Sequence, residues 1–296
     1  MPSGTNQPIV FFGTEDFSLY SLRSLVEHGF NIVGVVTKPD SKRGRSNQLI
    51  EPAVKTYAVS KGIKVWQPSK LSDVTDDIDQ LDRPSGVLVS FGKIIPERII
   101  NLFSPGIINV HPSLLPRYRG PSPIESAILN RDSSTGVTIM QLVKDMDAGP
   151  IYAQSTYQLD QTETKPQLYE RLGQLGADLL IKYLPLILSG EITPMPQDNA
   201  RSSYCHLLAK SQSLLDTKNC TSDELEAQVR AYLGFPKSRL SVGELEIIVT
   251  KSHTKKSGET PLDIICADNR YLSVDELIAP SGKTMTRDQF LRGYKI

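Results

Sequence analysis

Two polar side chains stand at the end of an otherwise apolar stretch of this chain. Residues 106–110 read GIINV, which is typical of a buried strand, yet Asn109 is polar and His111 follows directly. Because side chains on a strand alternate between its faces, Asn109 and His111 are expected to point to the same side. An Asn amide can donate to an oxygen that gains negative charge, and a His can donate to that oxygen or move a proton. The pair therefore predicts chemistry at a carbonyl group.

A carboxylate that could complete this site is offered by the loop VKDMDAGP at 143–150. The loop holds Asp145 and Asp147, and Asp147 is better placed to turn inward because Ala-Gly follows it. A carboxylate beside an imidazole favours the charged imidazolium and fixes its orientation. Asn, His and Asp without Ser or Cys indicate direct acyl transfer with no covalent intermediate. They are a poor zinc set, so we expect no catalytic metal.

The elements that must position these residues follow from the apolar pattern. Short apolar runs, separated by helical segments, indicate a mostly parallel sheet covered on both faces, a Rossmann-like α/β domain spanning 1–188. In such sheets ligands bind at the carboxyl ends of the strands, where Asn109 and His111 are expected. The runs that predict strands lie at 8–12, 31–37, 86–91, 106–110, 136–142 and 151–159.

The turn after the first strand argues against a dinucleotide or ATP site. It reads FFGTEDF, with one glycine and two acids. A pyrophosphate site needs three spaced glycines that let the backbone approach the phosphates, and carboxylates there would repel them. No GxxxxGK[ST] sequence is present either.

The chain changes character after the first domain. Residues 189–203 are polar, contain two prolines and predict a linker. Residues 204–296 contain short alternating strands and predict a small C-terminal β-barrel of the OB-like kind. Two helix starts are also predicted: a capping box of Ser122 and Glu125, and a helix that begins after Thr164 and ends at Pro185.

The amino-acid composition is typical of a soluble globular protein, and the formal net charge is zero. Lys+Arg and Asp+Glu both number 33, so there is no overall argument for nucleic acid or membrane binding, and a partner of either kind would need a local patch. The 3 cysteines form no CxxC pair, which suits a reducing compartment. The N-terminus does not resemble a signal peptide, and no apolar run approaches a membrane span. We therefore expect a cytoplasmic protein.

The segments INVHPSLLPRYRG and GVTIMQLVKDMDAGPIY resemble the folate-dependent formyltransferases, which transfer a formyl group from 10-formyltetrahydrofolate to an amine. The resemblance implies that Asn109 and His111 stabilise the oxyanion. It also implies that Asp147 supports His111 and proton transfer from the attacking amine. A folate site is implied as well, formed by the loop after the strand and by the segment SFGKIIP: Ser113, Leu114, Leu115, Pro116, Phe91 and Gly92.

Over nearly its whole length the chain is similar to the branch of this family whose acceptor is initiator methionyl-tRNA, a substrate of translation initiation. The loop DSKRGRSNQ resembles the basic loop that follows the second strand in that branch. Lys42, Arg43 and Arg45 could contact tRNA phosphates there. The resemblance implies that 204–296 is a tRNA-binding domain. We expect a monomer with no membrane partner.

Other functions stay open on the residues alone. A formyl-folate transferase acting on a small amine, such as an amino sugar nucleotide, is favoured by the nearly neutral composition of 204–296. A formyl-folate hydrolase would use water in place of the amine. A folate or nucleic-acid binding module without catalysis is disfavoured by the set of Asn109, His111 and Asp147.

Overall fold

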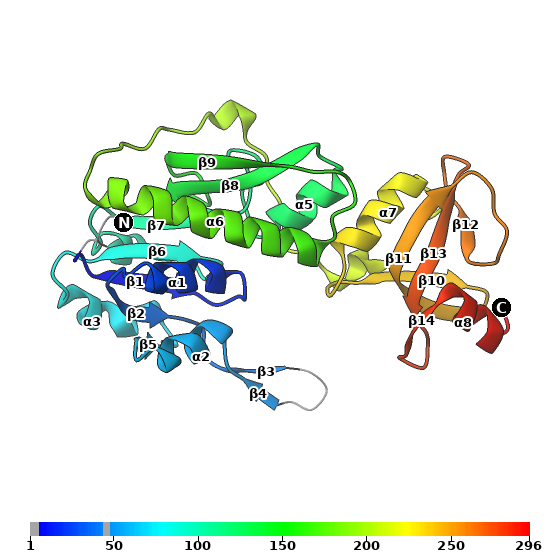
Figure 1. The fold of residues 1–296 in the computed structure, drawn as a ribbon, viewed down its shortest axis with the longest axis horizontal. Coiled ribbons are helices and arrows are strands. Elements are labelled where there is room, and N and C mark those ends of the chain that lie inside the picture. The colour runs from blue at the N-terminus through cyan, green and yellow to red at the C-terminus, as the bar shows by residue number, and fades with distance from the viewer. Residues whose placement is uncertain (1–5, 44–47) are drawn as a thin grey trace. The chain divides into compact units, whose positions relative to one another are not determined.

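The computed structural model describes residues 6–43 and 48–296, and these divide into two compact units (Figure 1). The first unit comprises the described residues up to Pro121 together with Thr135–Tyr157 and Tyr169–Tyr204. The second comprises Ser122–Ser134, Gln158–Leu168 and Cys205–Ile296. Residues 189–203, which we expected to form a linker, thus lie in the first unit. No helix among the described residues has the length and apolarity needed to cross a membrane.

A seven-stranded sheet, ordered β5-β2-β1-β6-β7-β8-β9, forms the centre of the first unit. The strands from β5 to β7 in this order pair in parallel, and β8 runs antiparallel to β7. The central strands are apolar on both faces because helices cover both sides. The strands are β1 (Ile9–Gly13), β2 (Ile32–Val36), β5 (Lys64–Trp66), β6 (Ser85–Val89), β7 (Ile107–His111), β8 (Ser134–Gln141) and β9 (Ile151–Gln158).

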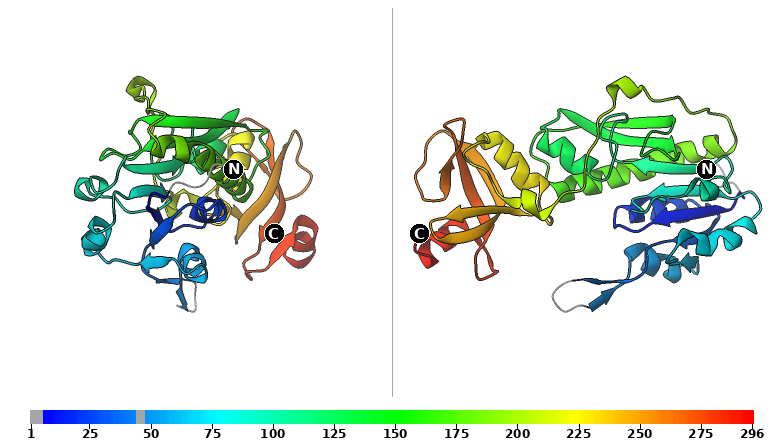
Figure 2. Two further views of the ribbon diagram at one scale, coloured as in Figure 1. Left: turned by 60° about the vertical axis from the view of Figure 1, so that its left-hand side comes forward. Right: turned by 180° about the vertical axis from the view of Figure 1, so that it is seen from behind.

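Helices α1 and α6 lie side by side against the sheet (Figure 1). A Cβ built on Gly173 of α6 would lie 2.4 Å from the ring of Tyr20, so a glycine is needed for this close approach. A separate hairpin of β3 and β4 extends away from the sheet (Figure 2). These elements are α1 (Ser18–Glu27), β3 (Ser41–Arg43), β4 (Gln48–Ile50), α2 (Ala53–Ser60), α3 (Thr75–Asp79), α4 (Glu97–Ile100) and α6 (Lys165–Leu188), with 3₁₀ turns at Leu71–Val74 and Asn199–Arg201.

An antiparallel sheet dominates the second unit. Its order is β10-β11-β13-β12, and β14 also pairs with β13. One apolar face packs on α7 and α8 around Leu225, Val274 and Phe290. A Rossmann-like domain followed by a small β domain is therefore confirmed. The elements are α5 (Pro123–Leu129), the 3₁₀ turn Lys210–Ser213, α7 (Ser222–Ala231), β10 (Ser238–Val242), β11 (Leu245–Lys255), β12 (Asp263–Ile265), β13 (Tyr271–Ile278), β14 (Thr284–Thr286) and α8 (Arg287–Gly293).

Two predictions about helix ends are wrong. Ser122 takes the N-cap position of α5, as expected, but its hydroxyl donates to the carbonyl oxygen of His206 at 2.5 Å, so the capping box with Glu125 does not form. Glu125 instead forms an ion pair with Lys165 at 2.7 Å. A buried carboxylate is costly unless a positive charge compensates it, and a neutral backbone amide would not do so. Pro185 does not end α6, which continues to Leu188.

The carboxylate of Asp263 lies at the centre of a buried network in the second unit. It accepts hydrogen bonds from Ser273 Oγ at 2.5 Å, from the backbone N–H of Glu259 at 2.9 Å and from Lys255 Nζ at 2.9 Å. Arg287 Nη1 lies 3.5 Å away. Burial alone raises the pKa of Asp263, but the hydrogen bonds from Ser273, Glu259 and Lys255 outweigh burial and hold the pKa well below its usual value.

We expect the Asp263→Asn variant to destabilise the second unit, since two cations then lose their buried acceptor. The loss at pH 7 should be about 3 kcal/mol. Because the folded pKa is lowered, this contribution is complete above the unfolded pKa of about 4 and disappears as pH falls below it. Hydrogen exchange of the β12 and β13 amides in the full chain measures the effect, and we expect roughly hundredfold faster exchange at pH 7.

The exposed Glu244→Gln variant is the matched control and should leave exchange unchanged. Tryptophan fluorescence cannot replace this measurement, because the one tryptophan, Trp66, lies in the first unit. If the β12 and β13 amides of the Asp263→Asn variant exchanged as slowly as those of the wild type, the network would have no stabilising role.

Candidate active site

Asn109 and His111 lie near the carboxyl end of β7, where the parallel strands of the first unit finish together. Asn109 pairs with Leu88 of β6, and His111 pairs with Thr138 of β8. Both residues are 5% exposed, so the surrounding protein covers them almost completely. Their spacing of two residues places them on one face of the sheet, as expected.

Asp147 joins this pair from the turn that links β8 to β9. Its Oδ1 accepts a hydrogen bond from Asn109 Nδ2 at 3.4 Å, and its Oδ2 lies 3.7 Å from His111 Nδ1. The backbone N–H of Gly120 donates to Oδ2 at 2.8 Å. The structure therefore brings the three predicted residues together. Asp145 lies exposed on the same turn.

The hydrogen-bond partner of His111 shows which of its ring nitrogens carries a proton. Its Nε2 lies 2.9 Å from the carbonyl oxygen of Tyr118. Since a carbonyl oxygen only accepts, Nε2 carries a proton, and Nδ1 is the nitrogen that can take up or release another. That nitrogen faces Asp147, so the two groups can share the task of moving a proton.

Three residues other than glycine adopt a left-handed backbone in the loops that follow β6, β7 and β8. They are Ser90 (φ 45°), Tyr118 (φ 56°) and Asp147 (φ 47°). Such a backbone is costly for most side chains and is enriched at functional sites. At Asp147 the close packing of the turn enforces it: a Cβ on Gly149 would lie 1.8 Å from the carbonyl oxygen of Gln141.

The loop after β7 is held by hydrogen bonds of its own. Ser113 Oγ donates to the carbonyl oxygen of Arg117 at 2.7 Å, and Thr138 Oγ1 donates to that of Ser113 at 2.6 Å. Ser113 and Leu115 are buried, whereas Leu114 and Pro116 are half-exposed. The buried pair thus fixes the loop, and the other two can meet a ligand.

The segment after β6 also contains one buried residue and one exposed residue. The ring of Phe91 is buried and packs edge-on against Phe12, with ring centroids 5.7 Å apart. Gly92 is exposed with φ 66°, and a Cβ there would lie 2.5 Å from Lys38 Nζ. Gly92 therefore presents bare backbone beside a cation, while Phe91 supports it from the core.

The basic residues of the loop after β2 are placed only in part. Lys42 and Arg43 lie on β3, where their backbones pair with Leu49 and Gln48 of β4. Arg45 lies outside the described residues. The structure thus assigns two of the three residues to a hairpin and does not bring them to Asn109 and His111.

The sequence did not predict the residues that hold Asn109, His111 and Asp147 in place. Tyr118 and Gly120 act through backbone groups, and their side chains gave no signal. Arg119 and Gln197 are 3% and 8% exposed, and Gln197 Oε1 accepts from Arg119 Nη2 at 2.7 Å. The two arginines of this Pro-rich loop, Arg117 and Arg119, were the one available clue, whereas Gln197 stood in a segment assigned to a linker.

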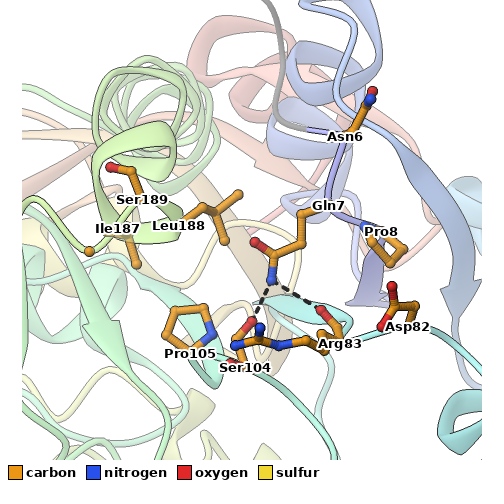
Figure 3. A pocket seen from close by; sticks show the side chains of 11 residues that line it. Asn6, Gln7, Pro8, Asp82, Arg83, Ser104, Pro105, Ile187, Leu188 and Ser189 are labelled. Atoms are coloured by element: carbon orange, nitrogen blue, oxygen red, sulfur yellow. Dashed lines mark hydrogen bonds between the residues drawn. The ribbon is translucent and has the colours of Figure 1, made fainter.

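A cavity of about 480 Å³ opens elsewhere in the first unit (Figure 3). There Gln7 donates to the carbonyl oxygens of Arg83 and Ser104 at 3.1 and 2.6 Å. These residues precede β1, β6 and β7, so the cavity lies at the amino ends of the parallel strands, opposite Asn109 and His111. Within the described ranges, no three His, Cys, Asp or Glu side chains are grouped to hold a metal ion.

The chain is similar to known proteins along nearly its whole length. Residues 8–184 match the model of the formyl transferase family. Over 303 residues the chain is 35% identical to the methionyl-tRNA formyltransferase of Sulfurihydrogenibium sp. (strain YO3AOP1), covering 97% of each chain. It is 40% identical over 226 residues to that of Dictyoglomus thermophilum, covering 75% of this chain and 72% of the relative.

Solved structures show the same fold. WlaRD, a sugar 3N-formyl transferase crystallised in the presence of dTDP and 5-N-formyl-THF, superposes with a TM-score of 0.70 at 22% identity. The match covers 92% of this chain and 98% of WlaRD, so both the Rossmann-like sheet and the C-terminal strands have counterparts there.

Proposed function

The chain belongs to the formyl transferase family, and from that premise we propose that it transfers the formyl group of 10-formyltetrahydrofolate to the methionyl amino group of initiator methionyl-tRNA. The observation that supports methionyl-tRNA as the acceptor substrate is the 35% identity to a methionyl-tRNA formyltransferase, which extends over 97% of each chain. The same similarity supports a role in translation initiation and hence a cytoplasmic location. We further propose that the protein acts as a monomer.

Asn109 is the donor we assign to the formyl oxygen. An amide nitrogen carries two hydrogens, and the bond to Asp147 uses one of them. The second can donate to the formyl oxygen, which gains negative charge as the acceptor nitrogen attacks the formyl carbon. A preorganised donor in a buried site is worth about 10²–10³ in rate.

His111 and Asp147 are the groups we assign to proton movement. The new bond joins the acceptor nitrogen to the formyl carbon, and the bond from that carbon to N10 of the folate breaks. One proton must leave the acceptor nitrogen and one must reach N10. His111 Nδ1 can perform this exchange, and Asp147 Oδ2, 3.7 Å away, stabilises the imidazolium that forms in between.

The residues at the site fit a folate. Gly92 presents exposed backbone, which can bond the polar edge of a flat heterocycle, and Leu114 and Pro116 provide half-exposed apolar surface. Lys38, beside Gly92, adds a cation that can donate to a carbonyl oxygen of the same heterocycle. Ser113, Leu115 and Phe91 would act as support, because their side chains are buried.

The tRNA contact is proposed for the β3–β4 hairpin and the second unit. Replacing Lys42, Arg43 and Arg45 by Ala should raise KM for tRNA about tenfold and reduce its salt dependence, because phosphate contacts are lost. KM for the formyl donor should stay unchanged. Steady-state kinetics at two salt concentrations measure both values.

A matched control replaces three exposed cations elsewhere in the first unit, Lys61, Lys70 and Arg98. It carries the same loss of charge and should leave KM for tRNA within about twofold. Equal kinetics for the two triple variants would remove the hairpin from the proposed tRNA site.

The second candidate acceptor is the amino group of a sugar nucleotide, which the likeness to WlaRD favours. Incubation with 10-formyltetrahydrofolate and either methionyl-tRNA or an amino sugar nucleotide decides between them. Formyl-methionyl-tRNA is the product we expect. A formylated sugar would select the second candidate, and free formate in the absence of an acceptor amine would indicate a hydrolase.

A further inference from the structure

The side chain of Gln197 connects two loops of the candidate active site. Its Nε2 donates to the carbonyl oxygens of Asp147 at 2.8 Å and Gly149 at 2.7 Å. Its Oε1 accepts from Arg119 Nε at 3.1 Å and Nη2 at 2.7 Å. Both amide hydrogens and the amide oxygen are thus used, and the side chain is 8% exposed. A buried amide with every bond made holds its partners in one arrangement.

Arg119 stands between the two backbone groups that orient the catalytic side chains. The carbonyl oxygen of Tyr118, directly before it, accepts from His111 Nε2, and the N–H of Gly120, directly after it, donates to Asp147 Oδ2. Arg119 as a whole is 3% exposed, and its guanidinium is held by the two hydrogen bonds to Gln197. The position of Arg119 thereby sets the positions of His111 and Asp147.

The chain around Gln197 is itself tied to these loops. Met195 pairs with Ile151 through N–H to carbonyl bonds of 2.7 and 2.8 Å. The N–H of Ser203 donates to the carbonyl oxygen of Pro116 at 3.1 Å, and the N–H of Arg119 donates to that of Ser203 at 2.8 Å. The segment from Met195 to Ser203 is therefore anchored at both ends, with Gln197 between the anchors.

We propose that Gln197 is a positioning residue for formyl transfer, which acts by holding the Asp147 turn and the Arg119 loop at one separation. The inference rests on the proposed function for its kinetic consequences. Asp147 keeps a left-handed backbone with φ 47°, which relaxes easily once its carbonyl oxygen loses a donor. A carboxylate displaced by about 1 Å costs roughly a hundredfold in rate.

Two variants separate the bonds of Gln197. Gln197→Leu removes all of them, whereas Gln197→Glu keeps the acceptor for Arg119 and places a carboxylate against the carbonyl oxygens of Asp147 and Gly149. We expect kcat to fall about a hundredfold in both, while KM for tRNA and for the formyl donor changes less than about threefold. Steady-state kinetics on the full chain provide these values.

Hydrogen exchange supplies a reading that does not depend on activity. In both variants the amides of 144–150 should exchange about tenfold faster than in the wild type, because the turn opens more often. Val74→Ala, a truncation in the core of the first unit, is the control for lost stability. It should leave kcat and the exchange of this turn unchanged.

The outcomes distinguish the inference from the proposed function. If the wild type formylates methionyl-tRNA and either Gln197 variant keeps its full kcat, the inference is wrong while the function stands. If the wild type forms no product, the function fails, and unchanged exchange at 144–150 in the variants would then overturn the inference as well. If Val74→Ala lowers kcat as much as Gln197→Leu, the effect belongs to stability and the positioning role is rejected.

Discussion

The His111→Gln variant is expected to transfer formyl groups about a thousandfold more slowly than the wild type. A Gln amide can still donate to the carbonyl oxygen of Tyr118, so the loop after β7 keeps its anchor. It has no counterpart of Nδ1 and cannot exchange protons near neutral pH. The loss should therefore appear in kcat, with little change in KM for the formyl donor.

A histidine outside the candidate active site provides the control for this prediction. His253→Gln is the control, because its imidazole is 52% exposed on the second unit. A His111→Gln enzyme with wild-type kcat would end the assignment of His111 to proton transfer.

The Asp147→Asn variant is expected to lose about three orders of magnitude in kcat, an effect comparable to that of His111→Gln. The amide oxygen can accept from Gly120 N–H, but the amide nitrogen then faces Asn109 Nδ2, so a donor meets a donor. The variant also lacks the negative charge that stabilises the His111 imidazolium. Single-turnover rates of formyl transfer measure the loss without interference from product release.

The neighbouring acid offers a close control. Asp145→Asn removes the same charge from an exposed position on the same turn and should keep kcat within about threefold. The double variant of His111 and Asp147 should be little slower than either single variant, because the two residues act as a unit. Fully additive losses would show that the two residues act independently.

The strand that carries the site could be predicted from residue types and spacing. Asn109 and His111 are polar residues two apart at the end of an apolar run, and the period of a strand places them together. Asp147 was identified by its turn of Ala and Gly and by the family resemblance. These residues could be predicted from their own residue types and their immediate sequence neighbours.

The residues that hold the site could not be predicted in this way. Tyr118 and Gly120 contribute backbone atoms, which every residue possesses. Gln197 lies 50 positions after Asp147, and a polar segment with prolines looks the same whether it links two domains or packs on one. The capping box of Ser122 and Glu125 failed for a related reason, because distant partners, His206 and Lys165, took both side chains.

The α/β sheet, the β-rich C-terminal part and the polar pair at the strand end were predictable, because apolar periodicity and side-chain alternation are properties of neighbouring residues. Tertiary structure alone decided the separations of Asn109, His111 and Asp147 and the support that Arg119 and Gln197 give them. Those distances depend on contacts between segments far apart in the chain. The polar contacts among them form because buried polar groups need hydrogen-bond partners inside the protein.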